Sequence, residues 1–158
     1  MEVRKLAISV RMAATDVRKV KAIAKRLGVR DSDVFRYAVK NSLAQLAPLG
    51  DPAVRGRDLL PVFVEAGPVL IRYFDLDAMR LAQIVNSGVG ESDTLVEPQD
   101  LTLLSAAGLQ ESYALVRLSE LLPEVGTVPQ GGEGLVDALR SYLYRKYVFR
   151  QQDHIAAG

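Results

Sequence analysis

Residues 5–12 (KLAISVRM) alternate strictly between apolar and polar side chains. In an extended segment the apolar side chains would share one face: Leu6, Ile8, Val10 and Met12. The opposite face would carry Lys5, Ala7, Ser9 and Arg11. Period-two alternation predicts a half-buried strand. The residues that follow have helical patterns, so we expect this strand to pair with its copy in a second chain, as an antiparallel two-stranded ribbon.

Two amphipathic helices are predicted after this segment. The first covers residues 16–27, with Thr15 as its N-cap and Gly28 as its left-handed end. Its apolar residues recur at helical spacing, and its other side is basic: Arg18, Lys19, Lys21, Lys25 and Arg26. The second covers residues 32–46, is capped by Asp31 or Ser32, and is stopped by Pro48 and Gly50.

A segment of about forty residues cannot bury all three apolar faces by itself. We therefore expect a homodimer, or a tetramer built from dimers, that closes the core between chains. The dimer core would contain Leu6, Ile8, Val10, Met12, Val20, Ile23, Phe35 and Val39.

Charge divides the chain sharply, although its net charge is only +1. Residues 1–46 hold eleven Lys and Arg against four acids, a net charge of +7. The rest holds nine basic and fifteen acidic residues, a net charge of −6. A basic segment joined to an acidic one is expected where only one part meets a polyanion. The alternative is a helix that is Lys-rich without any such partner.

The order of strand, helix, glycine turn and Ser/Asp-capped helix resembles the ribbon-helix-helix family of DNA-binding proteins, the Arc-type repressors. The resemblance covers residues 4–46 and rests on the joint spacing of residues 8–12 (ISVRM), Leu27-Gly28 and Ser32-Asp33-Val34. It implies an obligate dimer whose ribbon enters the major groove. It also implies that three outward-facing strand residues touch base edges: Ala7, Ser9 and Arg11.

Each of these residues has a defined capacity for base contact. Arg11 can pair with guanine O6 and N7, Ser9 can donate or accept, and Ala7 offers only a methyl contact. The family usually has a polar residue at the position of Ala7. The resemblance also implies a phosphate contact at the second helix, through the amides of Asp31, Ser32 and Asp33, with Arg30 and Lys5 at the margin. Taken singly, Arg11 and Ser9 could be plain surface residues, and Ser32 could be a plain N-cap.

The remaining chain predicts an acidic, helical C-terminal domain at residues 58–158, after a linker at 47–57 with two prolines and two glycines. Residues 58–66 fit a helix or a strand, and we favour a helix that Gly67-Pro68 breaks. Further helices are expected at 78–87, capped by Asp77, and at 101–107, opened by Pro98-Gln99-Asp100 and closed by Gly108. Two more are expected at 109–122 and 135–149, with a flexible stretch at 123–134. The last helix ends in interleaved aromatic and basic residues, which we expect to pack on their own domain or across a dimer rather than stack on nucleic acid.

Several function classes are disfavoured. The chain has no Cys and a single His, so neither a multi-His metal site nor a His-based triad can be built from one chain. It has no Walker or dinucleotide glycine motif. We therefore expect no enzyme, no cofactor and no metal. With neither an apolar run of about 18 residues nor a signal-peptide core, we expect no membrane association and a cytoplasmic location.

The sequence thus predicts a mainly α protein with an N-terminal ribbon-helix-helix domain that binds double-stranded DNA as a dimer. Transcriptional repression is the favoured use. The first alternative is an accessory DNA-binding factor of a conjugative relaxosome or a plasmid-partition system. Further alternatives are an antitoxin and a dimerisation module without DNA activity. The C-terminal domain would bind a protein partner or an effector, or set the oligomeric state.

Overall fold

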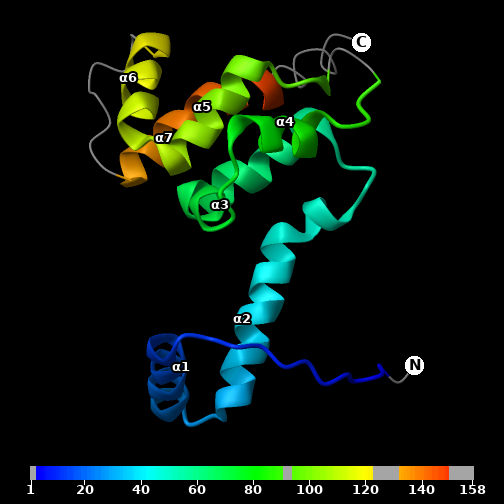
Figure 1. Ribbon diagram of the computed structural model, residues 1–158, viewed down its shortest axis with the longest axis vertical. Coiled ribbons are helices and arrows are strands. Elements are labelled where there is room, and N and C mark those ends of the chain that lie inside the picture. The colour runs from blue at the N-terminus through cyan, green and yellow to red at the C-terminus, as the bar shows by residue number, and fades with distance from the viewer. Residues whose placement is uncertain (1–2, 91–93, 123–131, 150–158) are drawn as a thin grey trace. The chain divides into compact units, whose positions relative to one another are not determined.

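A computed structural model describes residues 3–90, 94–122 and 132–149. All regular elements in these ranges are helices (Figure 1). The chain divides into two compact units, Met1–Ala44 and Gln45–Gly158, and each is described by itself.

The first unit contains α1 (Ala14–Leu27) and most of α2 (Asp31–Leu46). Gly28 adopts the left-handed conformation at φ 69° and ψ 31°, and its N–H reaches carbonyls in the last turn of α1. This confirms the predicted helix end. The N-cap of α1 is Ala13 rather than Thr15, so the helix begins two residues earlier than expected.

The predicted β-ribbon is wrong: the part of the chain that the structure describes contains no strand. Residues 3–13 carry no regular secondary structure, and their side chains are exposed. Alternation decides which side chains would share a face, but a strand also requires a neighbouring strand for its backbone hydrogen bonds. Every regular element in the described residues is a helix, which satisfies its own backbone, so the alternating segment has no such neighbour.

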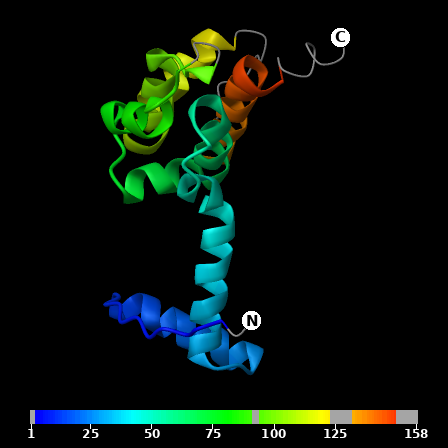
Figure 2. The same ribbon diagram turned by 90° about the vertical axis from the view of Figure 1, so that its right-hand side faces the viewer.

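The second unit is built around α5 (Pro98–Leu109), whose residues from Leu103 to Gly108 are all buried. Helices α3 (Leu60–Tyr73), α4 (Ala78–Asn86), α6 (Glu111–Leu121) and α7 (Gly132–Leu143) pack against it (Figures 1 and 2). Short 3₁₀ turns at Ala47–Gly50 (η1) and Gly56–Leu59 (η2) precede α3. A π-helical turn at Tyr144–Val148 (η4) extends α7.

Helix α3 settles the ambiguous region in favour of a helix. Gly67, at φ 74° and ψ −173°, is not helical, so α3 consists of two helical segments that meet at a kink before Pro68, which confirms the predicted break. Gly108 does not close α5: it lies inside the helix and is buried. A Cβ atom there would lie 2.6 Å from Ile71 Cγ2 and 2.9 Å from the Pro68 carbonyl oxygen, so this glycine permits the close crossing of α3 and α5.

The other helices follow the sequence more closely. Asp77 caps α4, accepting the Arg80 N–H at 2.8 Å as predicted. Helix α6 begins at Glu111 instead of residue 109. Helix α7 begins at Gly132, inside the stretch expected to be flexible. Residues 123–131 of that stretch lie outside the described residues.

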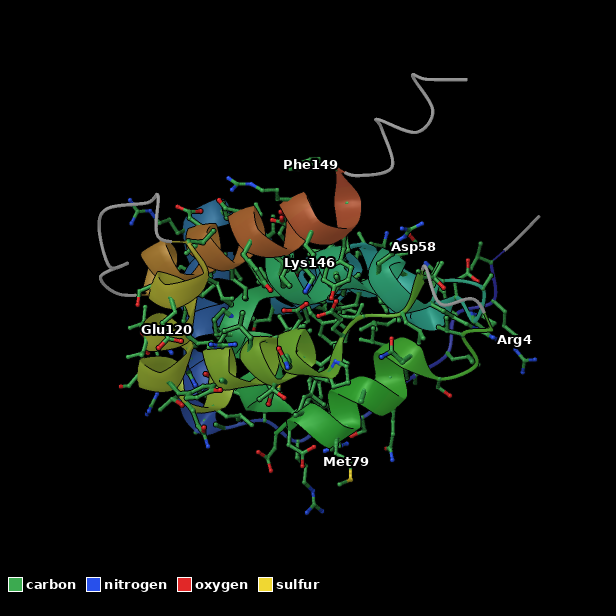
Figure 3. All side chains as sticks on the ribbon, turned by 90° about the horizontal axis from the view of Figure 1, so that it is seen from above. Arg4, Asp58, Met79, Glu120, Lys146 and Phe149 are labelled. Atoms are coloured by element: carbon green, nitrogen blue, oxygen red, sulfur yellow. The ribbon has the colours of Figure 1, made fainter. Side chains whose placement is uncertain are left out.

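Polar contacts fasten the last helix to the rest of the second unit. Arg140 binds Glu65 through two hydrogen bonds of 2.9 and 3.0 Å, and Tyr144 Oη donates to the same carboxylate at 2.8 Å. Lys146 lies on the inner side of this helix (Figure 3) and contacts Asp100 Oδ2 at 2.8 Å. Most of the aromatic and basic C-terminal residues thus pack on their own unit, as predicted, while Arg145 and Phe149 are exposed.

Candidate nucleic-acid interface

The basic residues of the first unit mostly lack ionic partners. Only three of its eleven Lys and Arg residues form ion pairs within the described structure: Lys19 with Asp16 (3.8 Å), and Arg30 and Arg36 with Asp33. The other eight are all exposed: Arg4, Lys5, Arg11, Arg18, Lys21, Lys25, Arg26 and Lys40. The side chain of Arg4, for example, projects outward (Figure 3). These unpaired cations create a positive surface potential over the unit.

In the second unit, most basic residues are hydrogen-bonded within the fold. Six of the eight described Lys and Arg residues donate hydrogen bonds to carboxylates or backbone carbonyls: Arg55, Arg72, Arg80, Arg117, Arg140 and Lys146. Arg117, Arg140 and Lys146 pair with carboxylates, and the other three donate to backbone carbonyl oxygens. The contrast indicates that the cations of the first unit are available to an external anion.

Helix α1 displays the densest group of these cations. Arg18, Lys21, Lys25 and Arg26 are exposed along a helix of fourteen residues, in which Asp16 is the one acidic residue. Arg18, Lys21 and Lys25 are spaced three and four residues apart, so they share one side of the helix. An array of cations along one helix is suited to a row of phosphates.

The residues predicted to touch bases lie on the extended segment before α1. Ala7, Ser9 and Arg11 are exposed, as is Lys5. The structure therefore places them where a partner could reach them, but without a sheet to hold them in register. Their role in base contact stays a prediction.

The predicted phosphate contact at the start of α2 is partly occupied by the protein itself. Asp33 accepts the Arg30 backbone N–H at 3.2 Å and the Arg30 Nε at 3.1 Å, while Arg36 Nη1 donates to it at 2.7 Å. Hydrogen bonding from Arg30 lowers the pKa of Asp33, so this carboxylate stays charged. Arg30 and the Asp33 carboxylate thus satisfy each other, and among the predicted residues Asp31 and Ser32 remain for a phosphate.

The predicted dimer-core residues are not buried within one chain. The exposed fractions are 74% for Leu6, 86% for Ile8 and 56% for Val39. Val10, Met12 and Ile23 are also exposed, while Val20 and Phe35 are half-buried. Ala24 is the only buried residue among those described in this unit. A unit with so small a core needs its apolar surface covered.

Sequence reasoning missed one polar cluster in the second unit. Asp100, predicted only to open a helix, is 2% exposed and accepts hydrogen bonds from Tyr142 Oη at 2.8 Å, Lys146 Nζ at 2.8 Å and Tyr147 Oη. Tyr142 and Lys146 are four residues apart on one helical face, the one available sign in the sequence. Burial raises the pKa of Tyr142 and of Tyr147. The cluster therefore joins α7 and η4 to α5.

Comparison with protein-family models, with curated proteins and with solved structures finds no match to this chain. Among the described residues, no helix combines the length and apolar character that crossing a membrane would require. The charge and exposure of the residues themselves are therefore the basis for inferring a function.

Proposed function

We propose that this chain binds double-stranded DNA as a homodimer through its first unit and acts as a transcriptional repressor. The observation that carries the proposal is the set of eight exposed, unpaired Lys and Arg residues within residues 4–40. Neutralising phosphates releases condensed counterions and supplies most of the affinity for duplex DNA.

Within this proposal the cations have two tasks. Those of α1 contact phosphates and position the protein without selecting a sequence. Arg11 and Ser9, on the extended segment, contact base edges and provide the selectivity. The second unit, with its own core, does not contact DNA and recruits a protein partner.

Dimerisation is part of the proposal because the first unit leaves its apolar side chains exposed. Burying apolar surface contributes about 25 cal/mol per Å². A second copy offers the same apolar surface, and two-fold symmetry would present two basic helices to one duplex. We expect a palindromic or tandem operator as a consequence.

A salt series tests the proposal directly. The full chain is titrated onto a random-sequence duplex between about 50 and 200 mM salt, and the slope of log K against log [salt] is measured. Lys21→Gln with Lys25→Gln should reduce the magnitude of the slope by about 0.9 for each phosphate that the protein no longer neutralises. The matched control is Arg145→Gln, an exposed cation of the second unit, which should leave the slope unchanged. Absence of duplex binding at the lowest salt would overturn the proposal.

A further inference from the structure

A cavity of about 580 Å³ lies in the second unit, where the kink of α3 meets α5, α6 and α7. Gly67 and Pro68, which make the kink, form part of its wall. The volume falls within the range of about 300–1,000 Å³ that is typical of small-molecule sites.

Much of the cavity wall is apolar. Ala66, Val69, Ala107, Leu135 and Val136 line it together with Pro68. Such a wall favours a ligand with an aliphatic or aromatic portion, since burying that portion removes apolar surface from water.

Four charged residues also line the cavity: Glu65, Arg72, Glu111 and Asp137. Two of them are engaged by the protein. Arg140 bridges Glu65 and Asp137, with its Nη1 2.9 Å from Asp137 Oδ1, so these carboxylates have their cation in place.

Arg72 and Glu111 can each bind a further charged group. Arg72 donates its Nε to the Gly108 carbonyl oxygen at 3.1 Å, and within the described residues its two terminal nitrogens have no hydrogen-bond partner. Glu111 forms no ion pair within the described residues. The cavity therefore offers one cationic and one anionic group beside an apolar wall.

We propose that this cavity binds a free α-amino acid with an apolar side chain. The ligand carboxylate pairs with Arg72, its ammonium group pairs with Glu111, and its side chain lies against the apolar wall. Charge-assisted hydrogen bonds of this kind are the stronger ones in proteins. The proposal rests on the cavity alone and does not depend on DNA binding.

The first test compares matched ligands on the full chain by isothermal titration calorimetry. L-leucine and L-phenylalanine are the probes, with 4-methylpentanoate as the leucine analogue without an amine and isoamylamine as the analogue without a carboxylate. We expect L-leucine or L-phenylalanine to bind. We expect each leucine analogue to bind at least about tenfold more weakly than L-leucine, because it leaves one charged group unpaired.

Two results of this comparison would overturn the proposal. One is no binding of either amino acid at about 10 mM, where even a weak site would be populated. The other is equal affinity for L-leucine and one of its single-ended analogues.

The second test uses substitutions in the cavity wall. Arg72→Gln and Glu111→Gln should each weaken amino-acid binding by about tenfold or more, as expected when one charge-assisted hydrogen bond is removed. Arg145→Gln is the control and should bind as the wild type does. Because Arg72 also contacts the Gly108 carbonyl oxygen, the exposed Glu111→Gln variant keeps the test independent of folding. Unchanged affinity in Glu111→Gln would contradict the assignment of the ammonium site.

Discussion

Arg11 is the side chain of the extended segment with the strongest capacity to distinguish bases. A bidentate contact to guanine contributes about 1–3 kcal/mol of discrimination. We expect Arg11→Ala to lose that amount on a duplex selected from a random library, and little on random DNA. Competition binding with both duplexes measures the difference. An equal loss on both would make Arg11 a phosphate contact.

Glu65 gives the second unit a pH-dependent contribution to stability. Hydrogen bonds from Arg140, and then from Tyr144, hold the pKa of Glu65 below its ordinary value of 4.5. A carboxylate with a depressed folded-state pKa stabilises the protein above its unfolded pKa, and this stabilisation is lost as the pH falls through the folded value. Glu65→Gln should therefore lower Tm more at pH 7 than at about pH 3.5.

The control for this prediction is Glu120→Gln. It breaks an exposed pair with Arg117 within α6, and pairs of this kind contribute little. Its effect on Tm should be smaller at pH 7 than that of Glu65→Gln. A Glu65→Gln effect that does not change with pH would show that the ion pair with Arg140 does not stabilise the fold.

The sequence correctly predicted the residues that end or cap helices, because the interactions that fix a helix end are local. Gly28 ends α1 and Asp77 caps α4, and each acts on backbone groups within five residues. Asp100 differs because its partner Lys146 lies 46 positions away. Arg72 and Glu111 likewise come together only through tertiary packing. The sequence identifies such residues as polar but does not pair them.

At the level of helices, Gly108 shows how composition misled the prediction. A glycine near the end of a helical pattern usually marks a C-terminus, yet here it allows α3 to approach α5. Gly108→Ala should destabilise the protein by about 1–3 kcal/mol, because the added methyl overlaps Ile71 and the Pro68 carbonyl. Urea unfolding measures this change.

Gly50→Ala is the matched control for the helix crossing. A Cβ atom at Gly50 would meet nothing within 4 Å. An exposed substitution of this kind should change the free energy of unfolding by no more than about 0.5 kcal/mol. Equal effects of the two substitutions would mean that the crossing of α3 and α5 adapts to the extra methyl group.

The difference between local and distant hydrogen bonds also explains why the strand prediction failed. Helices could be predicted within a few residues because their hydrogen bonds are local, as in α1 and α4. Residues 5–12 carry a strand pattern, but a strand depends on a second segment. Neither the pattern nor the charge of these residues identifies such a segment, so their exposure could be established only from the structure.

At the level of the whole molecule, the two units differ in how well they can stand alone. Among its described residues, the second unit has a core of 21 buried side chains linked in one cluster. The first unit buries only Ala24 among its described residues. A folded domain of about forty residues usually requires oligomerisation, metals or disulfides, and the chain has no Cys. Association of first units is therefore the step that would give this region a core.

Val39→Asp tests that association. If the exposed apolar residues of the first unit meet in a dimer, a buried carboxylate there should disrupt it, since an unpaired buried charge is costly. We expect the mass measured by sedimentation to be twice the chain's 17.3 kDa for the wild type and the mass of one chain for the variant. Met79→Asp, at a 72% exposed position of the second unit, should remain dimeric. A wild-type monomer at micromolar concentration would contradict the dimer, and a dimeric Val39→Asp variant would place the interface elsewhere.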